Sequence, residues 1–403
     1  MRILIINHFP LEGSGSGIYA MNLAKELSGR GNDVKVIFPE NTKISNDIYP
    51  FEIRPIYFKS YDDLKDVDVI DYNFPCFTSH PRSNNTFYEL TDEQMQLYID
   101  TFINVVKEEV QNFKPDIIHA QHLWITPYAA SKTDIPYIIT AHGTDLKGFR
   151  KDSRYHPYAL EGAQKAHKII TISQQVDKEV KALYNIEDSA RELVLNGYDE
   201  LLFYPKNISK EEVLKKFDIH IKPKYIVSFA GKLTHFKGAD TLLKAAKIYE
   251  NNISETTITL IAGNGELYDE LNELKKSLNL QNVFFLGHVS QESLVNIYNI
   301  ADVHVVPSRV EPFGLVAIEA LACGTPVVGT NQGGLIDFIN QDVGTLVDVD
   351  DDLALSEAIQ NELTGEDKVQ RRKVASQYAA MNFSWKKTID KLIKIYQQAV
   401  KNY

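Results

Sequence analysis

The sequence predicts an α/β protein of two domains, each built around a parallel β-sheet. Short runs of β-branched and other apolar residues alternate with longer amphipathic stretches, a pattern typical of strand–helix–strand units. The pattern occupies both halves of the chain and starts anew near residue 225. With 403 residues, the chain is also too long for one ordinary core. We therefore expect domains over residues 1–205 and 206–383, followed by a final helix over residues 384–403.

Composition excludes several classes of protein. Apolar residues make up 44% and charged residues 24% of the chain, as in globular proteins. The net charge of −11 argues against nucleic acid as a partner. No apolar run is long enough for a membrane-spanning helix, which leaves only peripheral membrane contact open. Cys76 and Cys323 cannot form a disulfide framework, and the first residues resemble a strand more than a signal peptide, so we expect a cytoplasmic protein.

In the first half, strands are expected where apolar runs end in polar or small residues. These runs are residues 2–7, 33–38, 51–58, 69–74, 116–120, 136–142, 168–173 and 192–197, with a long amphipathic helix over 92–113. Asp66 and Asp68 could be mistaken for a metal-binding acid pair, but we expect them to cap a strand.

Three glycines follow the first strand. Gly13, Gly15 and Gly17 stand in a predicted loop, where they could let backbone amides approach a phosphate or a sugar. A merely flexible loop is an equally good interpretation of this pattern. Glu40 ends the second strand where a ribose-binding acid of a nicotinamide enzyme would stand. The glycines run G-x-G-x-G rather than G-x-G-x-x-G, which argues against that cofactor.

In the second half, the strands are expected at 225–231, 257–263, 283–287, 303–308, 326–330 and 344–348. Lys232 and Lys237 follow the first of them, and Gly238 opens the next helix. Two cations after a parallel strand suit a diphosphate. The acidic run 350–352 is expected to be a solvated helix start.

The stretch 308–334 contains the most informative pattern. Its residues 315–323 have helical propensity, and Gly324 stands where a left-handed helix cap is expected. Gly314 and Leu315 fall at the start of this helix, so their amides could bind an anion. Glu319 lies one turn further on, and Glu311 precedes the helix.

The pattern SRVEPFGLVAIEALACGTPVV resembles the donor-site signature of the retaining family 4 glycosyltransferases. The resemblance implies the GT-B fold, in which two Rossmann-like domains face each other and the C-terminal helix crosses back to the N-terminal domain. It also implies transfer of a sugar, from a UDP-sugar in our expectation, to a hydroxyl acceptor by metal-independent front-face displacement. No cofactor is implied, because the nucleotide sugar is a substrate. The N-terminal domain would bind the acceptor and the C-terminal domain the donor.

The resemblance assigns roles to individual residues. Lys237 and Lys232 would stabilise the leaving diphosphate, although the family usually has Arg at the position of Lys232. Glu311 would hold the sugar hydroxyls and Glu319 the ribose, while His142 would contact the sugar near the reacting carbon. The other expected donor contacts are Gly15, Gly17, Gly231, Gly263, His288, Val289, Phe313, Gly314 and Leu315. His119 and His122 are expected to be packing or rim residues.

Lys147, Arg150, Lys151 and Arg154 follow His142 closely. They are either a solvated, mobile loop or a loop that orders around an acceptor bearing a carboxylate or a phosphate. We expect Lys147, Arg150 and Lys151 to contact such an acceptor.

Two other functions stay open at this point. The same architecture could serve a sugar-nucleotide epimerase or hydrolase. It could also serve a non-catalytic subunit that binds a sugar nucleotide, although the intact set of Glu311, Glu319 and Lys237 speaks against that role.

Overall fold

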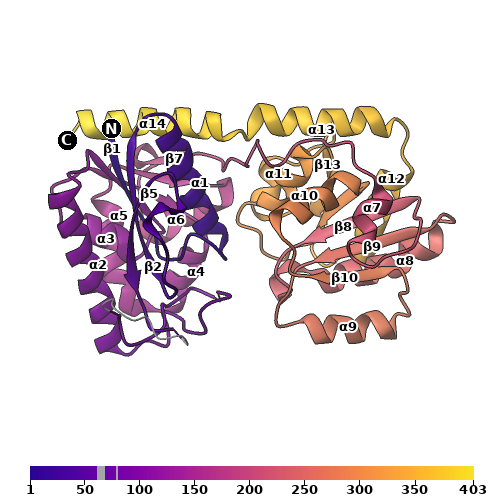
Figure 1. Cartoon of the computed structure of the whole chain (residues 1–403), viewed down its shortest axis with the longest axis horizontal. Coiled ribbons are helices and arrows are strands. Elements are labelled where there is room, and N and C mark those ends of the chain that lie inside the picture. The colour runs from indigo at the N-terminus through magenta and orange to yellow at the C-terminus, as the bar shows by residue number, and fades with distance from the viewer. Residues whose placement is uncertain (61–68, 79) are drawn as a thin grey trace. The chain divides into compact units, whose positions relative to one another are not determined.

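The computed structural model describes residues 1–60, 69–78 and 80–403. The chain forms two compact units (Figure 1), which are described separately. Unit 1 comprises Met1–Leu195 together with Lys386–Tyr403, and unit 2 comprises Asn196–Trp385.

In the described part of unit 1, seven parallel strands form one sheet in the order β3-β2-β1-β4-β5-β6-β7. The strands are β1 (Arg2–Ile6), β2 (Asp33–Glu40), β3 (Glu52–Tyr57), β4 (Ile117–Gln121), β5 (Tyr137–Ala141), β6 (Lys168–Thr171) and β7 (Arg191–Leu193). The order reverses between β1 and β4, which makes this the topological switch point of a Rossmann-like sheet.

Helices cover both faces of this sheet, with α2, α3 and α5 on one side and α1 and α6 on the other (Figure 1). Their bounds are α1 (Gly15–Gly29), α2 (Asp92–Asn112), α3 (Ile125–Ala130), α4 (Thr144–Lys151), α5 (His156–Gln164) and α6 (Gln174–Tyr184). The start of α2 is fixed by a capping box in which Thr91 and Gln94 bond each other's backbone amides.

The last helix, α14 (Trp385–Lys401), belongs to unit 1 from Lys386 onward. Its apolar stripe is buried, because Ile389, Leu392 and Tyr396 recur at helical spacing. The Tyr396 hydroxyl lies 2.7 Å from Nδ1 of His119 on β4, and the other ring nitrogen of His119 lies 2.7 Å from the Thr140 hydroxyl on β5. The expected return of the C-terminal helix to the N-terminal sheet is therefore confirmed, and His119 is a packing residue.

Unit 2 is described throughout and holds six parallel strands in the order β10-β9-β8-β11-β12-β13. They are β8 (Tyr225–Ala230), β9 (Thr257–Ala262), β10 (Val283–Gly287), β11 (Val303–Val306), β12 (Val327–Thr330) and β13 (Gly344–Val347). The helices are α7 (Lys210–Lys215), α8 (Ala239–Asn252), α9 (Tyr268–Ser277), α10 (Gln291–Ile300), α11 (Leu315–Ala322), α12 (Asp352–Thr364) and α13 (Lys368–Asn382). The switch point lies between β8 and β11, and the fold class expected from the sequence is confirmed.

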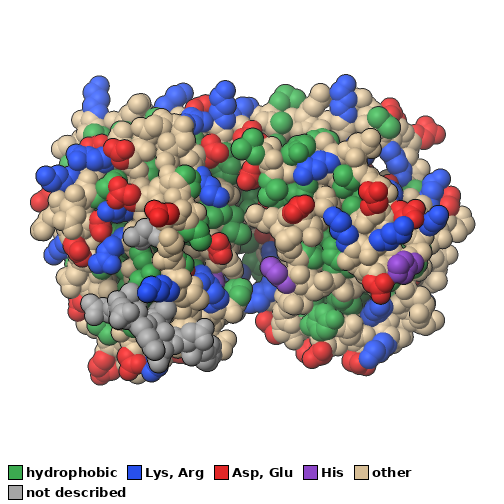
Figure 2. Space-filling model, in the orientation of Figure 1, with side chains coloured by type: hydrophobic (Ala, Val, Ile, Leu, Met, Phe, Trp, Pro, Cys, Tyr) green, Lys and Arg blue, Asp and Glu red, His purple; other side chains and the backbone are tan. Residues whose placement is uncertain are grey.

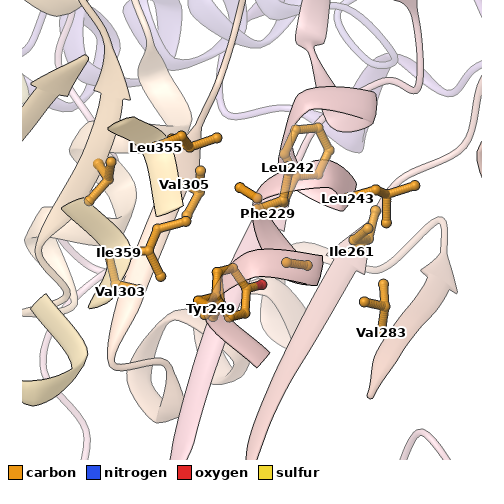
Figure 3. Packing of buried hydrophobic residues seen from close by; sticks show 14 of the residues in the cluster. Phe229, Leu242, Leu243, Tyr249, Ile261, Val283, Val303, Val305, Leu355 and Ile359 are labelled. Carbon is orange, nitrogen blue, oxygen red and sulfur yellow. The ribbon is translucent and has the colours of Figure 1, made fainter. Parts of the chain in front are cut away.

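The core of unit 2 has one apolar layer on each face of the sheet. Alternate residues of β8 point to opposite faces, so Val227 and Phe229 pack with α8 and α12, whereas Ile226 packs with α7 and α10. Figure 3 shows the first layer, in which Phe229 and Tyr249 lie among aliphatic side chains that include Leu242, Ile261 and Ile359. A sheet covered on both faces presents its strand ends for ligand binding.

The strand expected over residues 69–74 was wrong, because only Ile70 forms a bridge, to Phe58. Side chains take the place of the ladder beyond it: Asn85 donates to the carbonyl of Asn73, and Ser83 to that of Phe74. The expected acid pair Asp66 and Asp68 lies outside the described residues.

Lysines and arginines are interspersed with acidic side chains over the face shown in Figure 2. None of the described helices combines the length and the apolar character needed to cross a membrane.

Candidate functional site

The residues that follow β8 and β11 meet at the switch point of unit 2. After β8 the chain makes the short helix η4 (His235–Lys237) and turns at Gly238 into α8. Gly238 has φ +67°, and a Cβ atom on it would lie 2.0 Å from the carbonyl oxygen of Pro307. Only glycine fits so close to the end of β11. The turn that carries Lys237 is therefore pressed against the loop that carries Glu311.

Lys237 and Glu311 form an ion pair across this switch point. Lys237 Nζ lies 2.7 Å from Glu311 Oε2, and the Ser308 hydroxyl donates a 3.0 Å hydrogen bond to the same oxygen. Glu311 is 6% exposed, whereas the Lys237 side chain keeps 29% of its surface. Lys232, the other predicted cation, is exposed in the same loop as Lys237. Two charged residues predicted for the donor site are thus in direct contact.

Arg309 holds this arrangement in place and was missed by the sequence analysis. Its backbone amide donates to the carbonyl of Phe236 at 2.8 Å, and its guanidinium donates to the carbonyl of His235 at 2.8 Å. The guanidinium also grips both oxygens of Asp240, at 2.8 and 2.7 Å, and hydrogen bonds to Asp240 raise the pKa of Arg309. The sequence did hold a signal for Arg309, because this residue stands between Ser308 and Glu311 in the signature.

Arg309 also corrects the expectation for residues 350–352. Asp351 caps α12, as expected of a helix start. Asp350, however, pairs with Arg309 at 2.6 Å instead of being merely solvated. Its φ of +62° turns the chain toward that guanidinium. The loop after β13 thereby helps to hold the turn that carries Lys237.

Helix α11 begins where the sequence predicted. Gly314 is its N-cap with φ +101°, and a Cβ atom on Gly314 would lie 2.5 Å from Leu335 and 3.6 Å from Glu311 Cγ. The first amides of a helix have no partner within it, so those of Leu315 and its neighbours face the site beside Glu311. The ring of Phe313 is buried against Phe338, which leaves its backbone as the group able to contact a ligand.

Glu319 lies one turn further along α11 and is half-buried. The Tyr298 hydroxyl donates to Glu319 Oε2 at 3.4 Å. Burial, reinforced by the charge of Asp199, raises the pKa of Glu319 to about 8. The Glu319 carboxyl group therefore takes up a proton at a higher pH than an ordinary glutamate.

Backbone contacts join the ends of β8, β9 and β10. Gly263 has φ +139°, and a Cβ atom on it would lie 1.9 Å from the carbonyl oxygen of Gly231. The amide of Gly263 donates to the carbonyl of Gly287 at 2.7 Å. His288 follows as an exposed residue and Val289 as a half-buried one. Backbone, more than side chains, forms this part of the predicted donor site.

The switch point of unit 1 has a different character. His8, His122 and His142 follow β1, β4 and β5, and all three are buried. The ring centroids of His122 lie 5.7 Å from His8 and 4.7 Å from His142. Burial lowers the pKa of His8 and of His142 to about 3, so both rings are neutral at physiological pH.

Hydrogen bonds orient two of these rings but not the third. His8 Nε2 accepts from the Thr126 amide, so its Nδ1 donates to the Tyr98 hydroxyl at 2.7 Å. His142 Nε2 lies 2.9 Å from the side-chain oxygen of Gln121. Neither ring nitrogen of His122 has a hydrogen-bond partner among the described residues, and its φ is +72°.

Aromatic side chains fill the space around His122. The rings of Phe9 and Phe77 lie 5.2 and 5.3 Å from its ring. His122 therefore packs inside unit 1, whereas His142, 8% exposed, keeps a small accessible surface.

Of the three glycines after β1, only Gly13, with φ +85°, lies in a loop. Gly15 and Gly17 lie in the first turn of α1, and Ser14 caps that helix by accepting a hydrogen bond from the Gly17 amide. A Cβ atom on Gly17 would lie 2.2 Å from the carbonyl oxygen of Pro10, so glycine is needed there for packing. The flexible-loop interpretation was wrong because the cap and this close contact order the turn.

The cationic segment after His142 is also ordered, so the expected loop was wrong. Lys147, Arg150 and Lys151 lie on α4, where cations in the last turn complement the helix dipole. Arg150 pairs with Glu179 at 2.8 Å, and the Lys151 ammonium lies 4.0 Å from the centre of the Tyr88 ring. Residue 154, predicted beside them, is engaged elsewhere: Arg154 pairs with Asp152 and Asp92.

The Glu40 carboxylate is not available to bind the ribose of a nicotinamide cofactor, because other groups of the protein bond to it. Its Oε1 accepts from the amides of Asn41 and Thr42 at 2.8 and 3.0 Å, and Arg82 bonds both of its oxygens. Across residues 1–60, 69–78 and 80–403, no group of three or more His, Cys, Asp or Glu side chains could hold a metal ion.

Two family models match the chain in succession. Residues 13–200 match glycosyltransferase family 4, and residues 209–381 match the glycosyl transferases group 1. A D-inositol 3-phosphate glycosyltransferase of Mycolicibacterium smegmatis is 32% identical over 309 residues, which cover 72% of this chain and 68% of that protein. An uncharacterised glycosyltransferase of Methanocaldococcus jannaschii is 29% identical over 348 residues, covering 82% and 80%.

Solved structures show the same fold at low sequence identity. Sucrose-phosphate synthase from Thermosynechococcus elongatus aligns with a TM-score of 0.78 and 21% identity over 100% of both chains. HepE of Anabaena, solved in complex with UDP and glucose, aligns with a TM-score of 0.72 and 18% identity over 100% of this chain and 99% of that one.

Proposed function

The chain belongs to glycosyltransferase family 4, and from that premise we propose that it moves a sugar from a nucleotide-sugar donor to a hydroxyl acceptor with retention of anomeric configuration. The observation that carries the proposal is the Lys237–Glu311 pair beside the first amides of α11. A cation, a buried carboxylate and a helix N-terminus at a switch point suit a diphosphate with an attached polyol. We propose a UDP-sugar as donor, which the UDP complex of HepE supports.

Each charged group has a part in the proposed reaction. The bond between the anomeric carbon and the diphosphate oxygen breaks, and the acceptor oxygen bonds to that carbon from the same face. The acceptor proton passes to the departing diphosphate, so no enzyme nucleophile is required. Lys237, Lys232 and the amides at Gly314 and Leu315 stabilise the growing negative charge. Glu311 then hydrogen-bonds to the sugar hydroxyls.

Glu319 and His142 complete the proposed contacts. Glu319 would bind the ribose hydroxyls, and its raised pKa gives this contact a pH dependence. His142 would present a neutral imidazole to the sugar near the reacting carbon.

We propose that Lys147, Arg150 and Lys151 face the acceptor side. Relatives named D-inositol 3-phosphate glycosyltransferase support an acceptor that bears a phosphate. Arg150 and Lys151 already contact Glu179 and Tyr88, so an anion would have to compete with these partners.

The test is to incubate the full chain with UDP-, GDP- and ADP-sugars and a panel of hydroxyl acceptors, with and without a chelator. The expected product keeps the anomeric configuration of the donor, as read by NMR coupling constants, and forms at an undiminished rate without divalent metal. An inverted product would contradict the mechanism, and activity restored only by Mg²⁺ or Mn²⁺ would contradict the role given to Lys237. Hydrolysis or epimerisation of the donor without transfer would favour the alternative enzymes.

A further inference from the structure

A polar cavity lies in unit 1. Its volume is about 230 Å³, and it opens where β2 and β3 end. The residues that line it are Asn41, Thr42, Ser60, Pro81, Arg82, Ser83 and Asn84. All but the proline bring a side chain that can form hydrogen bonds. The volume lies below the range of roughly 300–1,000 Å³ typical of drug-sized ligands and suits a single small ring.

The charge of Arg82 is neutralised within the wall of this cavity. Its two terminal nitrogens contact the two oxygens of Glu40, and one of them also donates to the Thr42 hydroxyl at 2.9 Å. Glu40 is buried and cannot swing away without losing its bonds to the amides of residues 41 and 42. The wall is therefore polar and carries no net charge, because both oxygens of Glu40 are bonded to the Arg82 guanidinium.

The cavity is held in shape before any ligand binds. Asn41 is buried and donates to the carbonyl of Arg82 at 2.8 Å, which fixes the distance between the two walls. The Ser83 hydroxyl donates to the carbonyl of Phe74. The same segment reaches the turn before α1, because His80 Nε2 lies 3.1 Å from the carbonyl oxygen of Glu12. The cavity thus lies at the carboxyl ends of the strands, where α1 also begins.

We propose that this cavity binds a neutral, hydroxyl-rich ring of the acceptor, a sugar or a cyclitol. Each hydroxyl both donates and accepts, and the carboxamides, hydroxyls and neutralised guanidinium of the wall offer both kinds of partner. A phosphate would find only a guanidinium already bonded to both oxygens of Glu40 and, unlike at the site beside Glu311, no first amides of an α-helix among the lining residues. The inference rests on the proposed function, since it specifies the acceptor of that reaction.

The experiment measures binding of D-glucose, D-mannose, D-galactose and myo-inositol to the full chain by saturation-transfer NMR, with inorganic phosphate as competitor. At least one ring should bind. Thr42→Tyr, which fills the cavity from an exposed position, and Asn84→Leu, which removes an amide, should each weaken binding at least tenfold. Lys43→Tyr places the same ring on the exposed neighbour that does not line the cavity and should change nothing.

The proposal is overturned if no ring binds, if the Thr42 and Asn84 variants bind as the wild type does, or if phosphate displaces the ring. UDP binding is measured on every variant by thermal shift. It should persist in all of them, so that a failure of the acceptor cavity is separate from a failure of the proposed donor site.

Discussion

The two sheets share a strand order but differ in what stands at their switch points. In unit 2, Lys237 and Glu311 follow β8 and β11 and form an ion pair in which the Lys237 side chain stays partly exposed to solvent. In unit 1, His8 and His122 follow β1 and β4, are neutral, and are enclosed by aromatic rings. The same topology thus supports a charged site in one unit and a filled, uncharged one in the other.

This difference shows that the order of the strands determines where a ligand site can form. The side chains at the strand ends determine whether that place is open to a ligand. Phe77 and Phe87 come from the segment between β3 and α2, which has no counterpart after β10. Their rings close the switch point of unit 1. Polar groups stay accessible in unit 1 at the cavity bordered by Thr42, among other places, and at the small exposed surface of His142.

Removing the charge at the unit 2 switch point should have the largest effect. Lys237→Ala is expected to lower kcat about 100-fold or more, because the lysine acts on charge that develops in the transition state. Lys244→Ala removes an exposed cation from the same connection and serves as the control. Steady-state kinetics with matched thermal melts would check this, and unchanged turnover in Lys237→Ala would remove the residue from the mechanism.

Weakening the contacts by which Arg309 holds the turn of Lys237 should lower kcat by a smaller factor. Arg309→Lys keeps the positive charge but loses the two-pronged grip on Asp240, so kcat should fall roughly tenfold. If Arg309 only stabilised the fold, the melting temperature would fall while kcat of the folded enzyme stayed the same. Measuring kcat, donor KM and Tm on one preparation distinguishes these results.

Acid should weaken unit 1 more than unit 2. Burial lowers the pKa of His8, His119 and His142 to about 3 and holds that of His122 well below its usual value. Unit 2 has one buried histidine, His304, whose pKa is also lowered to about 3. Unfolded histidines titrate near pH 6.5, so the unfolded state binds more protons as pH falls from about 6.5 to 3. The stability of unit 1 is therefore present above that window and lost within it, by up to about 1.4 kcal/mol per pH unit for each histidine.

Urea titrations at pH 7 and pH 4.5, followed by pulsed hydrogen–deuterium exchange, report the two units separately. The acid shift should be larger for peptides of unit 1. A larger shift in unit 2 would contradict the contrast between the two switch points.

Glu319 provides a smaller effect with the opposite dependence on pH. Because burial raises the pKa of Glu319 to about 8, the stability that its neutral form supplies is lost as pH rises through 8. Glu319→Gln should therefore melt a few degrees above the wild type at pH 9, with a smaller gain at pH 5. Melting curves over this range would show it. Glu357→Gln, on an exposed face of α12, is the control, and a gain that does not depend on pH would contradict the shift.

The smallest effect on stability is expected at His122, within the uncharged switch point of unit 1. His122→Phe removes a ring without hydrogen bonds among the described residues, so Tm should hardly change. His8→Phe removes bonds to Tyr98 and Thr126 and should cost about 1–3 kcal/mol. Equal losses in the two variants would show that His122 has a role beyond packing.

The sequence revealed unit 2 more fully than unit 1 for a physical reason. Lys237, Glu311, Gly314 and Glu319 stand in two short segments whose spacing follows from one strand, one turn and one helix. Spacing alone predicted the start of α11 and the turn before α8. That Lys237 and Glu311, 74 residues apart, serve one site was implied only by the resemblance to the family signature. Arg309 escaped notice because its position in the signature was given no role and its partner Asp240 lies 69 residues away.

In unit 1 the environment of each residue depends on distant segments. The helix over Lys147, Arg150 and Lys151 was taken for a loop, since propensity alone does not show that Glu179 and Tyr88 would meet these cations. The missing strand at residues 69–74 has the same origin, because side chains from residues 83 and 85 take its carbonyls.

Hydrogen–deuterium exchange of the full chain with and without UDP tests the division between a charged unit 2 and an uncharged unit 1 most directly. We predict slower exchange with UDP in peptides covering residues 231–240 and 311–320, lost in Lys237→Ala, and unchanged exchange at residues 41–42 and 81–84. Protection confined to unit 1, or protection of unit 2 that survives Lys237→Ala undiminished, would contradict it.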